Sequence, residues 1–451
     1  MFSLQQLTLR KTLLMITLTA AIAILFLPNL PWPRSEQDLG DSGLPRHAEQ
    51  CVPFYDLIRR RIAEEGKAAK TSWKYSDSVS TELAPLAAYA FATYSAVTFQ
   101  TYGTRIEKVY CWYKDDQLRP LGRPVESIAS PRYTVYCCKH PRARYIGVST
   151  DEKNSSGVTY EEVIVRTENE TKYTLSHCLA PLHGNGTTWL LLTELIEHYL
   201  LHGVQHFYVY VHSMDPYSRR VLEDYVSTGE VEAIFFAQQS QYEYDMRYTA
   251  IQDCILRNRY HSNYLVMSDL DERMVTGNAN ESLVNLVLST MERHKNLGSI
   301  TFWSRFVFRT ADLPSTYKGE STLREHLPTL VFDNTTLTKA EKYYNCILNP
   351  LRVLDLLIPW GNDFLGNYTN RHVPLSAGYI RHYRNPFLGA FSTNTWPIIQ
   401  MSGTFQTIKY PEHLMGQLFQ NVQRRLDRVY KSDLMIDSTQ PNCQCNTTAN
   451  P

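Results

Sequence analysis

The sequence has no excess of charge of either sign, because 45 basic and 45 acidic residues give a formal net charge of zero over 451 residues. It also lacks a long basic run, so nucleic acid, which requires a positive surface, is not an expected partner. The nine cysteines form no pair of Cys-x-x-Cys motifs, which argues against a structural zinc site. The remaining composition, 43% hydrophobic and 20% charged, is that of a globular protein.

Near the N-terminus, charge is absent from Thr12 to Pro33, directly after the basic pair Arg10-Lys11. The apolar part, Thr12–Leu27, is long enough to cross a thin bilayer. A cleaved signal peptide is the alternative, but no small-x-small cleavage pattern follows the apolar core. Because flanking basic residues favour a cytoplasmic N-terminus, we expect a cytoplasmic tail at 1–11 and an uncleaved signal-anchor at 12–32.

Everything after the anchor is then expected in a lumen, and two further features agree. Asn-x-Ser/Thr acceptors for N-glycans occur at Asn154, Asn169, Asn185, Asn280, Asn334, Asn367 and Asn446. All nine cysteines follow the anchor, as disulfides in an oxidising compartment require, and their odd number leaves at least one thiol without an internal partner. We expect a single-pass type II membrane protein with a lumenal globular part; the family resemblance given below implies the Golgi membrane.

The lumenal part divides into segments that differ in composition and in their helix or strand patterns. Residues 33–75 read as a stem with a linker helix, because Pro, Gly and charge precede a helical pattern. Residues 76–175 contain short aromatic and β-branched runs between turn signals, which predicts a small β-rich module. Helical and strand patterns alternate in 176–435, which predicts a helix-covered, mainly parallel sheet. Residues 436–451 form a C-terminal tail.

The most informative motif lies in this α/β part. An apolar strand pattern from Tyr264 leads into Asp269 and Asp271, which are two residues apart. On a strand, that spacing points both side chains the same way. At the carboxyl end of a strand, where α/β sheets bind ligands, two such carboxylates can hold a divalent cation against a diphosphate. The interpretation is a nucleotide-sugar transferase. The alternative is a solvated strand end.

Four blocks of sequence resemble glycosyltransferase family 92, over about Tyr173 to Arg384. They are Glu194–Tyr208, Ala250–Arg259, Ser268–Glu272 and Gly378–Arg384. The resemblance implies a type II membrane enzyme with a GT-A-like sheet, which transfers a hexose from a UDP-sugar with inversion. Galactose is the sugar in the best-known members, and the acceptors are glycans or glycoproteins, including fucose on N-glycan cores in some animal members.

Three positions depart from the family pattern. They are Val211-His212-Ser213, where Asp or Asn followed by Asn is usual, Arg273, where an aromatic is usual, and Leu357-Ile-Pro-Trp360, where Gly-Ile-His is frequent. These departures affect the expected nucleotide contacts and acceptor choice more than the fold.

The resemblance also implies roles for single residues. Asp269, Asp271 and His382 are the candidate ligands of Mn²⁺ or Mg²⁺. Four residues are candidate contacts of the UDP-sugar: Asp269, Asp253, Arg257 and Arg384, with Arg381 as the alternative to Arg384. Asp253 and Arg257 are four residues apart on a predicted helix, so a supporting ion pair is the alternative for them.

Inverting transfer also requires a base that accepts the proton of the acceptor hydroxyl. The candidates follow the motif and remain undecided: Asp355, Asp363, Glu320 and Glu325. Glu272 is a weaker candidate, because strand alternation would turn it away from the aspartates. Glu194 and Glu197, on the first predicted helix, fit a solvated face.

Two other classes of protein stay open. One is a membrane-anchored carbohydrate-binding protein with a transferase-like fold that has lost catalysis. The other is a glycoside hydrolase that uses two carboxylates and needs no nucleotide.

Overall fold

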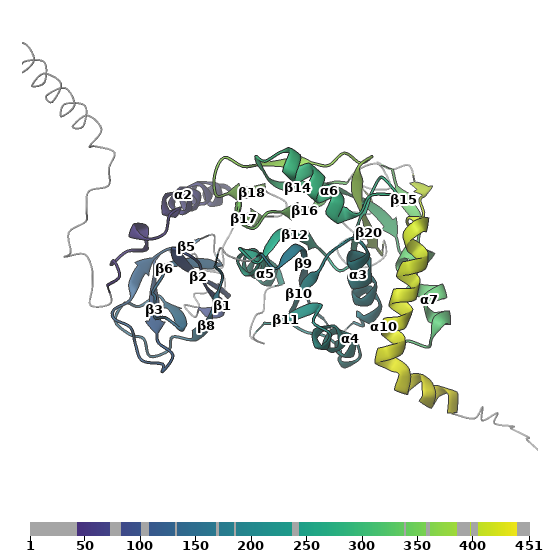
Figure 1. Ribbon diagram of the computed structural model, residues 1–451, viewed down its shortest axis with the longest axis horizontal. Coiled ribbons are helices and arrows are strands. Elements are labelled where there is room, and N and C mark those ends of the chain that lie inside the picture. Colours follow the sequence, from purple (N-terminus) through teal and green to yellow (C-terminus); the bar gives the residue numbers. More distant parts are fainter. Residues whose placement is uncertain are drawn as a thin grey trace, which may run out of the picture.

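A computed structural model provides the structure of the chain. It describes residues 43–72, 83–100, 108–130, 133–167, 171–184, 186–236, 243–337, 340–357, 361–385, 397 and 405–439. In these residues the chain forms two large β-sheets next to each other, with helix α5 (Glu243–Asn258) between them (Figure 1). The predicted tail and signal-anchor lie outside the described residues. Within the part of the chain that is described, no helix is both long and apolar enough to cross a membrane.

The first sheet is the predicted β-rich module, and helix α2 (Tyr55–Ser72) precedes it, as the helical pattern predicted. Its eight described strands lie in the order β4-β3-β7-β8-β1-β2-β6-β5. Their bounds are β1 Ala84–Ala90, β2 Tyr94–Gln100, β3 Val109–Lys114, β4 Val125–Ser127, β5 Ala129–Ser130, β6 Thr134–Cys138, β7 Tyr145–Ser149 and β8 Tyr160–Val165. Almost all neighbouring strands pair antiparallel; β1 and β8 are parallel.

Disulfides cross-link each of the two parts internally. Cys51–Cys138 joins the segment before α2 to β6, and Cys111–Cys137 joins β3 to β6. Cys178–Cys254 links the second sheet to α5. Closing long loops in this way reduces the entropy of the unfolded chain. Cys346 is a buried free thiol, which accounts for one cysteine of the odd number.

The second sheet contains the family-like blocks. Its strands are β9 Tyr173–Leu182, β10 His206–Val211, β11 Val231–Phe235, β12 Ser262–Ser268, β13 Glu272–Thr276, β14 Leu297–Phe308, β15 Asn334–Thr336, β16 Ala340–Leu348, β19 Thr369–His372, β20 Gly378–Arg384 and β21 Phe405–Thr407. The helices are α3 Trp189–Leu201, α4 Pro216–Ser227, α6 Leu283–Arg293, α7 Glu320–His326, α8 Pro328–Val331 and α10 Glu412–Thr439. Strands β17 (Val353–Leu357) and β18 (Gly361–Phe364) form a separate hairpin.

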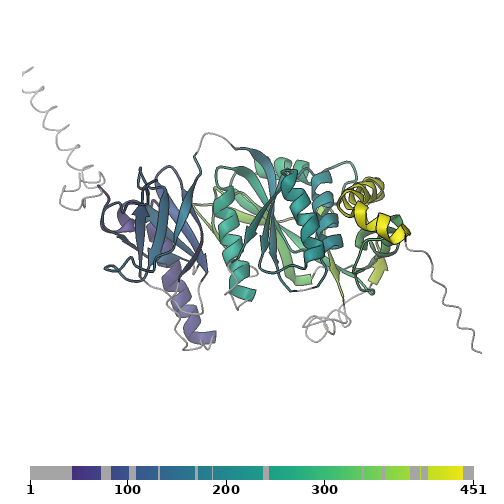
Figure 2. The same cartoon turned by 90° about the horizontal axis from the view of Figure 1, so that it is seen from below.

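This second sheet is mixed, so the prediction of a mainly parallel sheet holds for only one half of it. Strands β11, β10, β9 and β12 run parallel, whereas β16 pairs antiparallel with both β12 and β14. Strand β20 then runs parallel to β14 and antiparallel to β13. Helices α3 and α4 cover one face of the parallel half and α5 covers the other (Figures 1 and 2). This α/β architecture places the carboxyl ends of β9, β10 and β12 at one edge.

Local sequence signals explain where several elements end. The Asp215 side chain accepts from the backbone N–H of Ser218 at 2.9 Å, and Pro216 occupies the first position of α4. Gly203 follows α3 with a φ of +91°. A side chain there would meet Val284, so glycine satisfies both the left-handed backbone and the close approach of α6.

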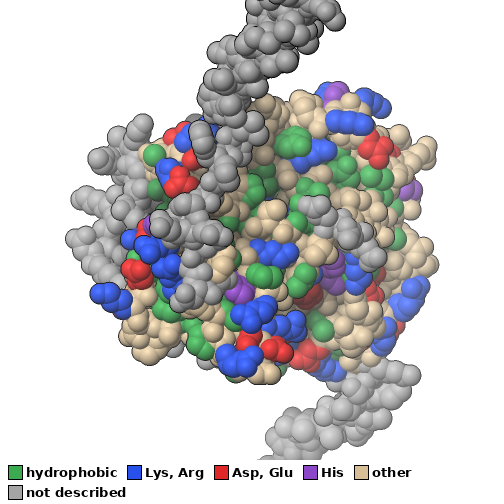
Figure 3. All heavy atoms as spheres, turned by 60° about the vertical axis from the view of Figure 1, so that its left-hand side comes forward, with side chains coloured by type: hydrophobic (Ala, Val, Ile, Leu, Met, Phe, Trp, Pro, Cys, Tyr) green, Lys and Arg blue, Asp and Glu red, His purple; other side chains and the backbone are tan. Residues whose placement is uncertain are grey.

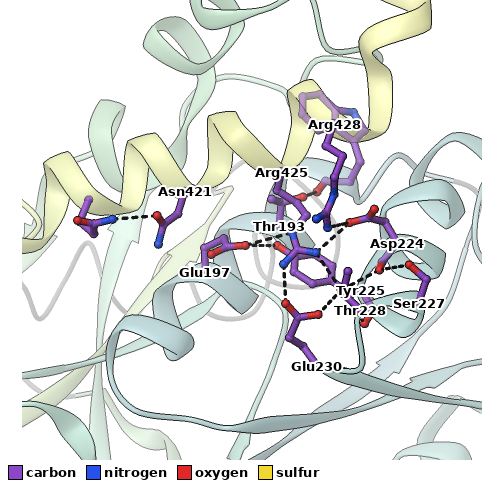
Figure 4. Close-up of polar contacts among 12 residues, drawn as sticks. Thr193, Glu197, Asp224, Tyr225, Ser227, Thr228, Glu230, Asn421, Arg425 and Arg428 are labelled. Atoms are coloured by element: carbon purple, nitrogen blue, oxygen red, sulfur yellow. Dashed lines mark hydrogen bonds and ion pairs between the residues drawn. The ribbon is translucent and has the colours of Figure 1, made fainter.

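Helix α10 packs across α3 and α4, and one arginine connects all three (Figure 4). Arg425 pairs with Asp224 at 2.9 Å and Glu230 at 2.8 Å and lies 3.8 Å above the ring of Tyr225. Its Nε is 3.4 Å from Glu197, so the expectation of a solvated Glu197 is wrong. The helix continues to Thr439, past the predicted domain end at 435.

On the surface, basic and acidic side chains are interspersed. Figure 3 shows Lys and Arg next to Asp and Glu on the face that it presents, without one large area of either sign. The predicted glycan acceptors that the structure describes, Asn154, Asn280, Asn334 and Asn367, are all exposed. They are therefore accessible for modification.

Candidate active site

The Asp269–Asp271 motif lies in a turn and not on a strand. Strand β12 ends at Ser268 and β13 begins at Glu272. Side-chain alternation therefore stops, and the two carboxylates point to different partners. Asp269 Oδ1 lies 3.0 Å from Arg247 Nη2 on α5, whereas Asp271 faces β20. The prediction that both carboxylates point the same way is wrong.

Asp271 lies in a group formed by β13 and β20. Its Oδ1 is 3.4 Å from His382 Nε2, and its Oδ2 is 3.3 Å from Arg384 Nε. Arg384 Nε also donates to His382 Nε2 at 2.8 Å. Burial raises the pKa of Asp271, but Arg384 and His382 outweigh that effect and hold the pKa well below its usual range. Asp271 is thus a carboxylate at every physiological pH, with 19% of its side chain exposed.

Glu272 belongs to this site, although strand alternation predicted that its side chain would point away from the two aspartates. Its Oε1 is 3.4 Å from His382 Nδ1, and its Oε2 accepts from the Asp269 backbone N–H at 3.0 Å and from Asn345 Nδ2. Burial raises its pKa to about 7, while His382 lowers it and Asp269 raises it further. The turn brings Glu272 back beside the aspartates, because its residues leave the strand geometry.

A small, partly open pocket adjoins Asp269 at the carboxyl ends of the parallel strands. It is lined by Cys178, Leu179, Ala180, Tyr210, Arg247, Ala250, Ile251, Met267, Ser268, Asp269 and Asn345. The Ser268 hydroxyl is 2.8 Å from Nε2 of the buried His177, so the rim beside Asp269 is held in place. This position is where parallel α/β sheets bind ligands.

Arg309, which no sequence signal indicated, belongs to the same neighbourhood. It follows the last residue of β14, and its backbone N–H donates to the carbonyl of Arg384 at 2.9 Å. Burial lowers its pKa; Asp271 and Asp312 act in the opposite direction, and Arg384 lowers it further. Only the pairing of β14 with β20 reveals this proximity, because the two arginines are far apart in sequence.

The predicted metal ligands are partly brought together. In the described residues, no group of three or more His, Cys, Asp or Glu side chains is close enough to hold a metal ion. Asp269 is paired with Arg247 and does not join the other two. Asp271 and His382 do lie side by side, and two protein ligands completed by substrate phosphates are an ordinary set for Mg²⁺. The residues thus fit a two-ligand site and not the predicted three-ligand site.

Asp253 and Arg257 are not at this site. Asp253 is fully buried and accepts from the hydroxyls of Tyr89, Thr98 and Tyr210, each at 2.7 Å. Arg257 Nε donates to it at 3.0 Å. Because Tyr89 and Thr98 belong to the β-rich module, this pair joins the two sheets, and the predicted nucleotide contact is wrong; the ion-pair alternative holds.

The four base candidates are not gathered in one place. Glu320 and Glu325 are exposed on α7, where Glu320 pairs with Arg324 at 2.8 Å. Asp355 and Asp363 face each other in the β17–β18 hairpin. Asp355 accepts from Gln252 of α5, and Asp363 pairs with Arg61 of α2 at 2.6 Å. Arg381, the alternative to Arg384, is fully buried and bonded to the Tyr383 hydroxyl at 2.9 Å.

The sequence profile of glycosyltransferase family 92 matches residues 173–424. This stretch is more than half of the 451-residue chain and includes Asp269, Asp271, His382 and Arg384. The chain belongs to glycosyltransferase family 92. The resemblance seen in the four sequence blocks is confirmed.

Two curated relatives agree with the family over shorter stretches. Beta-1,4-galactosyltransferase galt-1 of Caenorhabditis elegans is 27% identical over 114 residues, which cover 24% of this chain and 27% of that protein. Galactan beta-1,4-galactosyltransferase GALS1 of Arabidopsis thaliana is 28% identical over 120 residues, covering 25% and 24%. The chain thus matches about a quarter of the length of these relatives.

Similar solved structures include glucosyl-3-phosphoglycerate synthase of Mycobacterium tuberculosis in complex with Mn²⁺, UDP and phosphoglyceric acid. It is 13% identical, covers 53% of this chain and 88% of that one, and gives a TM-score of 0.28. Staphylococcus aureus TarS is 10% identical, with 39% and 47% coverage and a TM-score of 0.24. At scores this low, neither structure informs the reading of the site.

One departure from the family 92 pattern has a structural explanation. Arg273, where family members usually carry an aromatic residue, pairs with Glu194 at 2.8 Å, and both side chains are fully buried. Glu194 also accepts from the backbone N–H and hydroxyl of Thr329, at 2.8 and 2.7 Å. The expectation of a solvated Glu194 is wrong. Its buried carboxylate neutralises Arg273, the residue that departs from the family pattern directly after Glu272.

Proposed function

We propose that this family 92 chain is a metal-dependent inverting glycosyltransferase with a GT-A-type catalytic sheet, which moves galactose from UDP-galactose onto a glycan acceptor. The observation that carries the proposal is that the family match encloses two segments that the fold brings into contact. These are the Asp269–Glu272 turn and the His382–Arg384 strand end. Galactose is favoured because both curated relatives are named as galactosyltransferases.

In the proposed reaction, an acceptor hydroxyl oxygen attacks the anomeric carbon while the bond from that carbon to the diphosphate oxygen breaks. The electron pair of this bond stays on the departing UDP, and the hydroxyl proton passes to a base. A single displacement inverts the anomeric centre. The main task of the protein is to stabilise the negative charge that develops on UDP, which positioned cations do well in a water-poor site.

The side chains of the site suit that task. The pocket beside Asp269 takes the nucleoside end of the donor, and Arg247 limits the pocket at the N-terminal end of α5. Arg384 supplies a forked cation 3.3 Å from Asp271 and 36% exposed. Mn²⁺ or Mg²⁺, held by Asp271 and His382, would act as a Lewis acid toward the diphosphate.

The proposed location is the Golgi lumen, behind a single N-terminal signal-anchor. The described disulfides and the exposed glycan acceptors support it, because both are features of chains that mature in an oxidising secretory compartment. Removal of N-glycans from the full-length chain by an endoglycosidase should reduce its apparent mass. An unchanged mass would contradict a lumenal location.

The test of the activity is to incubate the purified full-length chain with a panel of UDP-sugars, glycan acceptors and Mn²⁺. We expect release of UDP from UDP-galactose, loss of that activity in EDTA, and recovery when Mn²⁺ is restored. Turnover unaffected by EDTA would contradict metal dependence. Binding of UDP without turnover on any acceptor would favour the inactive carbohydrate-binding alternative.

A further inference from the structure

The guanidinium of Arg309 forms no ion pair with an acid in the described part of the chain, although the charges of Asp271, Asp312 and Glu194 act on it. Its backbone N–H is bonded, but its side chain forms no hydrogen bond or ion pair with a described residue, and its Nε is buried without a hydrogen-bond partner. Buried polar atoms in native proteins are nearly always bonded, so such an atom requires an explanation. The Nε of Arg305, on β14, also lacks a hydrogen-bond partner, but the Arg305 guanidinium lies 4.7 Å above the ring of Tyr379.

The surroundings of Arg309 explain the missing partner. The backbone N–H of Arg309 donates to the carbonyl of Arg384 at 2.9 Å, and the Arg384 side chain is already paired with Asp271. Three acids act on Arg309 through their charge. Asp271 is already paired with Arg384 and Glu194 with Arg273, and Asp312 is the third. Arg309 is only half-buried, so an incoming anion has access to it. Desolvated guanidinium groups without a counter-charge are costly, and an anion bound between these two would remove that cost.

We propose that Arg309 and Arg384 together bind the diphosphate of the nucleotide-sugar donor, and that Arg309 supplies a guanidinium that forms no ion pair within the described part of the chain. This inference rests on the proposed function and adds to it a donor-binding residue that lies outside the four family-like sequence blocks. A nucleoside in the pocket beside Asp269 directs its phosphates across the turn toward Asp271 and Arg384. Arginine forks match phosphate oxygens in pairs, so two arginines joined through their backbones suit a diphosphate better than a single anionic group.

The experiment measures UDP and uridine binding by calorimetry to the full-length chain and to Arg309→Gln. Hydrogen bonds between charged groups contribute about 1.5–3 kcal/mol, so we expect UDP affinity to fall roughly 10-fold to 100-fold. Uridine carries no phosphate, and its affinity should stay within about 2-fold. This difference between the two ligands separates phosphate binding from a general distortion of the pocket.

A second variant and a matched control complete the test. Arg309→Lys keeps the charge but loses the fork, so UDP should bind with an intermediate affinity, also when the Gln variant is unstable. Arg305→Gln removes an arginine from β14, four residues before Arg309, and should leave UDP affinity within about 2-fold of the wild type. UDP affinity unchanged in both Arg309 variants would overturn the inference alone. A wild-type chain that binds no UDP would overturn the proposed function together with it.

Discussion

Two sets of acidic and basic side chains include residues of α5 and differ in how completely they are bonded. At the junction of the two sheets, the Asp253 carboxylate accepts four hydrogen bonds and is fully buried with Arg257. At the end of β12, Asp269 and Asp271 are partly exposed, and each faces an arginine without a full shell of donors.

The difference separates structural charges from charges available to a ligand. Complete bonding repays the desolvation of the buried Asp253–Arg257 pair, and removing either partner leaves an uncompensated charge. Incomplete bonding at Asp271 leaves lone pairs and arginine N–H groups that can rearrange around a substrate. Both sets look alike in sequence, as acids and arginines on predicted elements. Only the bonding in the folded chain separates them.

The largest effect that would test this comparison is on stability. Replacing Asp253 with alanine leaves Arg257 buried without its partner and three hydroxyls without their acceptor. We expect the free energy of unfolding in urea to fall by about 3–5 kcal/mol. Glu223→Ala, which removes an exposed acid paired with Arg219, serves as the control and should change it by less than about 0.5 kcal/mol. Equal losses in both variants would contradict a structural role for Asp253.

The opposite pattern is expected at Asp271. Asp271→Asn keeps the shape of the side chain but removes its charge, while Arg384 remains bonded to His382. Transfer from UDP-galactose should fall on the order of 100-fold, the size of loss seen when one preorganised charge partner is removed from an active site. The urea midpoint should stay close to that of the wild type. Full transfer activity in this variant would show that the turn has no catalytic role.

A smaller effect concerns pH and Glu272. Its pKa is raised from 4.5 to about 7, so the folded chain binds that proton more tightly than the unfolded chain. The resulting stabilisation is fully present below pH 4.5 and is lost as pH rises through 7. Between pH 5 and 8 the wild type should therefore lose stability relative to Glu272→Gln, measured as urea midpoints. Asp271, whose pKa is lowered, contributes its change only at more acidic pH. Parallel profiles would exclude a raised Glu272 pKa.

The smallest expected effect is at Glu320. This base candidate is exposed on α7 and paired with Arg324. Glu320→Gln should change transfer by less than about 2-fold and the free energy of unfolding by less than about 0.5 kcal/mol, since exposed ion pairs contribute little. A large loss of transfer with an unchanged KM for the donor would restore Glu320 as a base.

Strong local signals predicted much of the fold. The apolar strand pattern before Asp269 is confirmed as β12, and α4 and α3 begin and end at ordinary local signals, Asp215-Pro216 and Gly203. Such signals depend on neighbouring residues, so a linear reading detects them. The central strand β9 was not predicted from the sequence. It spans Tyr173–Leu182 and so crosses the predicted boundary between the β-rich and the α/β segments.

The chain sequence by itself determined the family, the alternation of helices and strands, and which short segments carry Asp269, Asp271, His382 and Arg384. Only the tertiary structure decided which charges belong together. Strand pairing brings β20 beside β13 and β14, and so places His382 and Arg309 near Asp271, whereas Asp253 becomes enclosed between two sheets. Long-range register and burial set these contacts, and neither is encoded in the spacing of neighbouring residues.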